Sequence, residues 1–199
     1  MKTHIFPALK LTLALIILLA FGYTLVIRGI ALFSMFGGNG ETVEKEGKVV
    51  GYKLIGQAFK SDKYFWGRPS AVDYNAAGSG GSNKGTTNPD YLKTVQARID
   101  TFLVHNPGTN RKDIPIELVT ASGSGLDPDV TPEAAYIQAP RIARVRNIDI
   151  NEIEKIIQKN IEKPFMGIFG TTRVNILKLN LELDNLSKHE ICNHIAKRK

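Results

Sequence analysis

Residues 78–89 (GSGGSNKGTTNP) combine the residue types that bind phosphate groups in nucleotide-binding loops: glycines, hydroxyls and a lysine, Lys84. A phosphate-binding P-loop has a glycine directly before its lysine and a serine or threonine directly after it. Here Asn83 precedes the lysine and Gly85 follows it, so the pattern fails at both positions. The sequence therefore favours a structural loop whose glycines adopt positive φ angles, although the helix start behind it could still attract an anion.

Two further groups of side chains could bind cations. Asp127 and Asp129 offer carboxylates, but the spacing of a calcium-binding loop is absent, and carboxylates before a helix commonly cap it. His189, Cys192 and His194 lie close together near the C-terminus, without the distant second pair of ligands that closes a zinc site. The spacing supports no nucleophile–base–acid set either. We therefore predict neither a metal centre nor catalytic residues.

The formal net charge of +7 over 199 residues invites a nucleic-acid interpretation. The basic excess, however, lies at the two ends: residues 1–36 contain no acid, and residues 188–199 are strongly basic. A nucleic-acid-binding domain needs a basic face on its folded body, which here is nearly neutral. We predict no nucleic-acid partner. With Cys192 as the only cysteine, an intrachain disulfide is also excluded.

Residues 11–27 (LTLALIILLAFGYTLVI) form an uncharged apolar run, and the apolar character continues to Phe36. A helix of this length spans roughly 26 Å, close to the thickness of a hydrocarbon core. A cleaved signal peptide is the competing interpretation, but its apolar region is shorter and ends at a small-x-small site. We predict an uncleaved anchor in membrane lipid over residues 1–36. An early span before a large domain favours a cytoplasmic N-terminus and an extracytoplasmic domain, although the flanking basic residues nearly balance.

The rest of the chain mixes strand and helix signals without the regular alternation of a doubly wound sheet. We therefore predict an α+β fold: one soluble domain, residues 37–187, behind the single transmembrane helix, followed by a basic tail at residues 188–199. β-branched and aromatic residues predict a strand over residues 48–59, and the string DIPIELVTAS suggests another over residues 116–121. Alternating leucines predict a third strand over residues 173–183. Helices are expected to begin after three capping residues, Asn88, Thr131 and Asp149. A break in the second helix is expected at Pro140.

The segment at residues 64–69 (YFWGRP) contains three consecutive aromatic residues, for which core or rim packing is expected. Pro69 restricts the residue before it, Arg68, to an extended conformation. Arg68 is a candidate for a binding contact with a cation or a partner.

Four strings appear together in the order and at about the spacing of the KdpC family, the C subunit of the bacterial Kdp potassium-transporting P-type ATPase. They are GQAFKSDKYFWGRPSA, SGGSNKGTTNP, LVTASGSGLDPDVTPEAAYIQAPRIARVR and VNILKLNLEL. The resemblance runs from the anchor to about Leu186. It implies a non-catalytic accessory subunit in a complex with a channel-like A subunit, an ATP-hydrolysing B subunit and a small single-span subunit. Such a complex imports potassium at the expense of ATP.

The resemblance implies one of two roles. In one, the subunit is a catalytic chaperone that raises the ATP affinity of the B subunit, and Gln57 matches the proposed nucleotide contact. In the other, it supports assembly and covers the potassium entrance on the external side. An exported domain cannot meet cytoplasmic ATP, so we expect the second role, with contacts to a cation or a partner from Asn83, Asp127, Asp129 and Arg68. A membrane-tethered binding module or hydrolase unrelated to transport is the remaining alternative.

Overall fold

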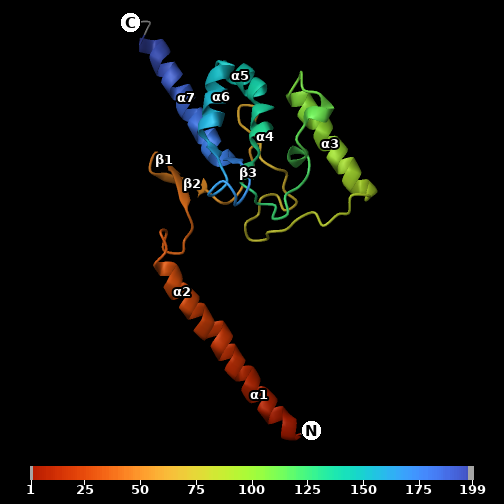
Figure 1. Cartoon of the computed structure of the whole chain (residues 1–199), viewed down its shortest axis with the longest axis vertical. Helices are drawn as coiled ribbons and strands as arrows, with labels where there is room; N and C mark the ends of the chain where they lie inside the picture. Colours follow the sequence, from red (N-terminus) through yellow and green to blue (C-terminus); the bar gives the residue numbers. More distant parts are fainter. Residues whose placement is uncertain (1, 197–199) are drawn as a thin grey trace. The chain divides into compact units, whose positions relative to one another are not determined.

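The computed structural model describes the backbone of residues 2–196 and the side chains of residues 4–186. The chain divides into two compact units, Met1–Glu41 and Thr42–Lys199. The first unit is one long helix made of α1 (Lys2–Ile16), a π-helical segment η1 (Ile17–Tyr23) and α2 (Thr24–Leu32) (Figure 1). Residues from His4 to Leu32 are long and apolar enough to cross a membrane, and none of the most apolar stretch is buried. This agrees with the single N-terminal span predicted from the sequence.

The second unit begins with a β-hairpin formed by β1 (Thr42–Lys45) and β2 (Lys48–Tyr52). The two turn residues have positive φ angles of 53° at Glu46 and 74° at Gly47, as two-residue hairpin turns require. The pairing register shifts so that Val50 is an extra residue, which is a β-bulge. The strand predicted over residues 48–59 is therefore real but shorter than expected, because the chain leaves the hairpin at Tyr52.

Five helices follow, and the capping residues predicted for three of them are confirmed. They are α3 (Pro89–His105), α4 (Pro132–Tyr136), α5 (Ala139–Arg146), α6 (Ile150–Lys159) and α7 (Ile176–Ala196). Asn88 accepts hydrogen bonds from the first N–H groups of α3, Thr131 does so for α4, and Asp149 for α6. These caps satisfy backbone donors that have no partner inside the helix. The break expected at Pro140 is also present, since α4 ends at Tyr136 and the proline lies in the first turn of α5.

The strand predicted over residues 173–183 is wrong beyond its start. Only Arg173–Asn175 form a strand, β5, and the helix α7 begins at Ile176. The side chain of Asn175 accepts a hydrogen bond from the N–H of Lys178 at 3.1 Å and so caps the helix. Leucine, lysine and glutamate are strong helix formers, and in a helix Leu179 and Leu183 fall on one buried face.

The strand predicted over residues 116–121 is also wrong. This region contains two short 3-10 turns, η2 (Arg111–Asp113) and η3 (Ile116–Leu118). The carbonyl of Pro115 accepts a hydrogen bond from the N–H of Leu118 at 3.0 Å, which closes the second turn. In this conformation Leu118 and Val119 are buried, whereas Ile116 is exposed, so the apolar residues no longer alternate as a strand would require.

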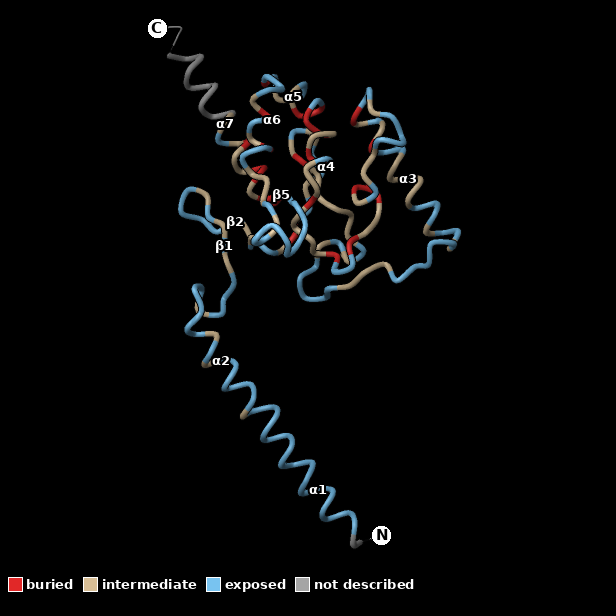
Figure 2. Tube along the Cα trace, viewed as in Figure 1, coloured by how far each residue is buried: buried red, intermediate tan, exposed pale blue. Residues whose placement is uncertain are grey.

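A small three-stranded antiparallel sheet has β5 at its centre, between β3 (Asp129–Val130) and β4 (Ile161–Glu162). Helices α4 to α7 lie together beside it, while α3 stands apart from them (Figure 1). Burial is concentrated between the sheet and these helices (Figure 2). The fully buried core side chains include Phe65, Ile142, Ile153, Ile157, Val174, Leu179 and Leu183. The architecture is α+β, as predicted.

Asp184 of α7 connects the hairpin to the helices. Its carboxylate accepts hydrogen bonds from Lys45 of β1 at 2.7 Å, from Arg146 of α5 at 2.9 Å and from the hydroxyl of Tyr64 at 3.3 Å. Partial burial raises the pKa of this carboxyl, but the hydrogen bonds and charges of Lys45 and Arg146 outweigh burial and hold the pKa below its usual range. Asp184 is therefore a charged junction between three parts of the domain.

Candidate functional site

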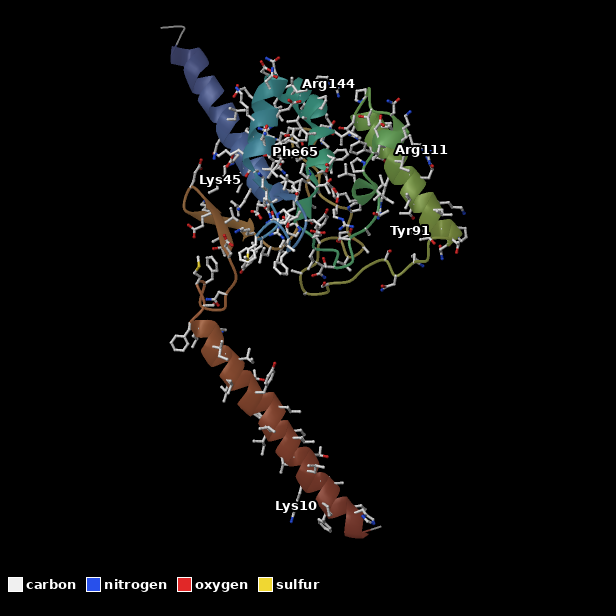
Figure 3. The ribbon with its side chains drawn as sticks, in the orientation of Figure 1. Lys10, Lys45, Phe65, Tyr91, Arg111 and Arg144 are labelled. Carbon is white, nitrogen blue, oxygen red and sulfur yellow. The ribbon has the colours of Figure 1, made fainter. Side chains whose placement is uncertain are left out.

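The aromatic segment is held in place by two side-chain amides, one from α7 and one from the residue directly before α5. Asn180 of α7 binds the backbone of Phe65: its Oδ1 accepts the N–H at 2.8 Å and its Nδ2 donates to the carbonyl at 3.0 Å. Gln138 binds the backbone of Trp66 in the same way, at 2.8 Å and 3.2 Å. Each amide pairs with one backbone N–H and one backbone carbonyl, as a neighbouring β-strand would. The buried backbone groups of this irregular segment therefore have hydrogen-bond partners. Phe65 is fully buried as a result (Figure 3).

Arg141 of α5 is the largest fully buried side chain of the described residues. Its guanidinium donates to Asn106 at 3.0 Å, to Gln138 at 2.8 Å, to the carbonyl of Tyr64 at 3.1 Å and to the carbonyl of Asp62. The group also lies 4.4 Å from the ring centroid of Trp66, in the geometry of a cation–π contact. Burial lowers its pKa to about 10, so it stays charged at neutral pH. Arg141 thus holds the aromatic segment through its backbone carbonyls and through the ring of Trp66.

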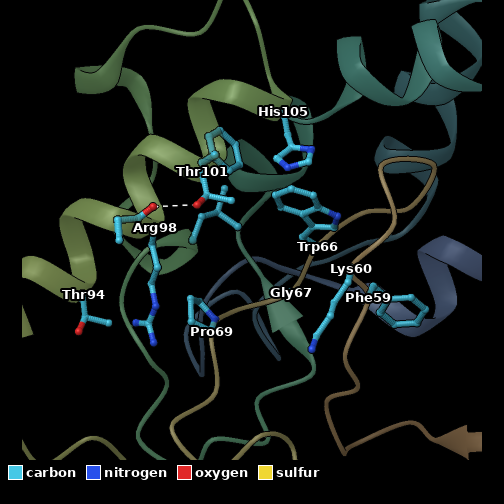
Figure 4. A pocket seen from close by; sticks show the side chains of 12 residues that line it. Phe59, Lys60, Trp66, Gly67, Pro69, Thr94, Arg98, Thr101 and His105 are labelled. Atoms are coloured by element: carbon cyan, nitrogen blue, oxygen red, sulfur yellow. Dashed lines mark hydrogen bonds between the residues drawn. The ribbon is translucent and has the colours of Figure 1, made fainter.

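A cavity of about 460 Å³ lies between α3 and this fixed segment (Figure 4). Its apolar walls come from Phe59, Trp66, Pro69, Ala97, Phe102 and Leu118. The rings of Trp66 and Phe102 meet edge to face with centroids 6.4 Å apart. The walls are therefore mainly apolar, as is usual for sites that bind small groups or a partner's side chains.

Three basic side chains border the cavity: Lys60, Arg98 and His105. Arg98 donates to the carbonyl of Val119 at 3.1 Å, and Nδ1 of His105 lies 2.8 Å from a carboxylate oxygen of Asp62. Among the side chains that the structure describes, no carboxylate lines the cavity. The arrangement can bind an apolar group, and its charge favours one that carries a negative end.

The two small-residue loops singled out in the sequence lie against each other. The N–H of Gly80 donates to the carbonyl of Ser124 at 2.9 Å, and the hydroxyl of Ser79 donates to the same carbonyl at 3.0 Å. A Cβ atom on Gly81 would lie only 3.0 Å from the carbonyl oxygen of Gly123. The positive φ angles expected for the glycines of residues 78–85 are wrong, since only Asn83 adopts one there. The glycines instead allow two backbones to approach closely.

The structure brings together two of the predicted site residues, Arg68 and Asp127. Nη1 of Arg68 lies 2.9 Å from a carboxylate oxygen of Asp127, and both side chains are largely buried. The other oxygen of Asp127 accepts the N–H of Asp129 at 3.1 Å. Asp127 therefore fixes the turn into β3 and neutralises Arg68 at the same time, which the sequence could not indicate because the two residues are far apart along the chain.

Asp129 has other partners than Asp127. Its carboxylate accepts a hydrogen bond from Asn175 at 3.0 Å and lies 3.3 Å from Nε of Arg173. Burial holds its pKa above the usual range, against the opposing effects of Asn175 and Arg173. Asp127 and Asp129 thus engage different basic partners.

The two remaining predicted site residues lie elsewhere. Asn83 is exposed on the glycine loop. Gln57 donates from its Nε2 to the carbonyl of Val50 at 3.2 Å, and it packs so closely on Gly51 that a Cβ atom there would overlap its amide. Gln57 therefore contacts the bulged strand of the hairpin.

No group of three His, Cys, Asp or Glu side chains that could hold a metal ion occurs where side chains are described. The side chains of His189, Cys192 and His194 lie outside those residues.

Sequence reasoning missed Gln138, Arg141 and Asn180, the three residues that hold the aromatic segment. A weak signal was present, because each of these polar residues stands among apolar neighbours in the sequence. Gln138 and Arg141 are three apart among alanines and isoleucines, and Asn180 lies between two leucines. A buried polar side chain needs partners, and here the partners are backbone groups of one distant segment.

Comparison with known proteins identifies the chain. Residues 5–185 match the family described as "K+-transporting ATPase, c chain". The potassium-transporting ATPase KdpC subunit of Flavobacterium psychrophilum is 53% identical over 183 residues, which cover 92% of this chain and 98% of that protein. The KdpC subunits of Bacteroides fragilis and Caldanaerobacter subterraneus are 50% and 44% identical, and the matches cover 94% and 96% of this chain and 98% and 100% of those proteins. This chain therefore belongs to the KdpC family, the c chains of potassium-transporting ATPases.

Proposed function

We propose that this chain is a non-catalytic subunit of an ATP-driven potassium importer and acts on the external side, over the potassium entrance. Its partners are a channel-like A subunit, an ATP-hydrolysing B subunit and a small single-span subunit. The N-terminal helix holds it in the membrane with its N-terminus in the cytoplasm. ATP and potassium are then ligands of the complex, and the domain contributes assembly and contact surfaces.

The observation that carries this proposal is that the glycine loop is used internally. The N–H of Gly80 donates to Ser124 in the facing loop, so it is not available to a phosphate group. Gln57, the candidate nucleotide contact, donates to Val50 in the hairpin. The glycine loop and Gln57, which suggested a nucleotide site, thus both make hydrogen bonds inside the domain. This favours the role at the potassium entrance over the role as a catalytic chaperone.

We further propose that the paired loops, residues 78–85 and 121–127, contact the channel-like subunit. Asn83 is exposed at one loop, while Arg68 and Asp127 hold the base of the other. Surface loops on a rigid base are a common place for binding residues. Asp127 and Asp129 would act by keeping this surface in shape rather than by binding a bare cation, because both already have basic partners.

The location of the domain can be tested by protease accessibility. A specific cleavage site inserted at Gly85, in the exposed loop, is expected to be cut in spheroplasts and protected in sealed inverted vesicles. A tag cleavable at the N-terminus serves as the matched control and should show the opposite pattern. Cleavage at residue 85 only in inverted vesicles would place the domain in the cytoplasm and favour the chaperone role.

The role of the loop base can be tested by neutralising its carboxylates. In the complex, the double substitution Asp127→Asn and Asp129→Asn should raise the potassium concentration for half-maximal ATPase activity about tenfold, equivalent to about 1.4 kcal/mol. Asparagine keeps the shape of the side chain but loses the charge that faces Arg68 and Arg173. Co-purification of the other subunits would show that assembly is intact.

Asp100→Asn is the matched control for this double substitution. Asp100 is an exposed carboxylate on α3 that accepts a hydrogen bond from a neighbour on the same helix, Gln96. It should leave the potassium dependence unchanged. An unchanged potassium dependence in the double variant as well would reject the proposed contribution of Asp127 and Asp129.

A further inference from the structure

The loop between β4 and β5 carries a group of exposed apolar side chains that we call the apolar tip: Phe165, Met166, Ile168 and Phe169. Their exposed fractions are 73%, 76%, 78% and 65%. Every residue from 165 to 173 is exposed. A cluster of large apolar side chains on the surface of a water-soluble domain commonly marks a contact with a membrane or a protein.

The apolar tip is a defined turn. The N–H of Phe165 donates to the carbonyl of Phe169 at 2.8 Å, and the N–H of Phe169 donates back at 3.0 Å. Met166 and Gly167 between them have positive φ angles of 53° and 75°. A bulky residue with positive φ is unusual, because asparagine or glycine adopts this conformation with less strain. The turn therefore holds the large, exposed apolar side chain of Met166 against the local preference of the backbone.

Two further observations favour lipid as the occupant. Residues 163–172 contain no carboxylate, and their only charged side chain is the exposed Lys163, which suits anionic headgroups next to an apolar wedge. In addition, the candidate membrane span ends at Leu32 and the second unit begins at Thr42. The intervening residues can extend by at most roughly 30 Å, so the domain stays next to the bilayer on whichever side it lies.

We propose that the apolar tip inserts into the lipid interface and gives the domain a second membrane attachment besides its helix. The side chains of Phe165 and Phe169 would sit among the headgroups and upper acyl chains, with Met166 and Ile168 at the deepest point and Lys163 at the phosphates. This inference depends on the membrane span but not on the role at the potassium entrance, since the tip could meet either leaflet.

The test uses the full-length chain with Cys192→Ser and one new cysteine, Met166→Cys, labelled with an environment-sensitive fluorophore. The chain is reconstituted into vesicles of phosphatidylcholine and phosphatidylglycerol, with or without lipids that carry a nitroxide quencher on the acyl chain. We expect a blue-shifted emission at residue 166 and a loss of intensity with the quencher lipids. Ile168→Cys should behave in the same way and guards against an effect of the strained position.

Val104→Cys is the matched control, because Val104 is an apolar side chain with a similar exposed fraction, 77%, on α3 of the same domain. It should not be quenched. Equal quenching at residues 104 and 166, or none at either tip position, would overturn the proposal. The same two quenching measurements, by aqueous iodide and by the nitroxide lipids, are repeated on the labelled chain assembled with the other subunits. A tip shielded from aqueous iodide but not quenched by lipid in that complex would mean that a protein partner, not the bilayer, covers it.

Discussion

Replacing Arg141 with methionine should lower the free energy of unfolding of the domain by about 3–5 kcal/mol, because several buried hydrogen-bond acceptors would lose their donor. The acceptors are Asn106, Gln138 and the carbonyls at the start of the aromatic segment. Methionine fills much of the volume but donates no hydrogen bond. Thermal or chemical unfolding of the full-length chain in detergent measures the change. Fluorescence of Trp66, the only tryptophan of the chain, reports directly on the segment that Arg141 holds.

Arg144→Met is the matched control for this prediction, since it makes the same replacement one turn further along α5. Arg144 is exposed, and it donates a long hydrogen bond of 3.4 Å to the carbonyl of His105. Its replacement should change stability by less than about 0.5 kcal/mol. If both variants unfolded at the same denaturant concentration, Arg141 would not be the residue that fixes the aromatic segment.

The helix starts could be predicted from the sequence because capping is local chemistry. Asn88, Thr131 and Asp149 each satisfy N–H groups two or three residues away, so residue type and position were enough. The break at Pro140 was predictable for the same reason, because a proline removes a donor at a fixed place in the helix.

The strand predicted at residues 173–183 failed because alternating leucines fit two structures. In a strand they would all lie on one face, and in a helix Leu179 and Leu183 do so as well. The cap formed by Asn175 and the helix-forming residues between the leucines decide the outcome. Here local propensity was the better guide than the alternation.

Most of the candidate site could not be predicted, because its contacts join distant residues. Gln138 binds Trp66, and Asn180 binds Phe65, across long stretches of the chain. Arg141 and Arg144 are equivalent in the sequence, and only the fold separates a buried cation from a solvated one. The resemblance to a family supplied the functional expectation, whereas the residues alone supplied the membrane span, the caps and the exclusion of a P-loop.

The role of a glycine also could not be predicted from the sequence, because the same residue type occurs both at close backbone contacts and in open loops. Gly56 lies where the segment after the hairpin crosses the turn before β3: its N–H donates to the carbonyl of Leu126 at 2.7 Å. A Cβ atom there would lie 2.5 Å from the carbonyl oxygen of Asp127. Gly85, in the exposed loop, has no neighbouring atom within 4 Å of the corresponding position. The first glycine is required by a backbone contact, and the second is not.

Gly56→Ala should therefore destabilise the domain by about 2–3 kcal/mol, because the added methyl group meets backbone atoms that cannot rotate away. The backbone shift would also move Asp127 away from Arg68, so the potassium dependence of the complex should change in the same direction as on neutralising Asp127. Gly85→Ala should leave stability unchanged or raise it by about 0.5 kcal/mol, since it restricts only the unfolded chain. Equal unfolding midpoints for the two variants would show that the crossing at Gly56 tolerates a side chain, and the rigid base proposed for the paired loops would then be wrong.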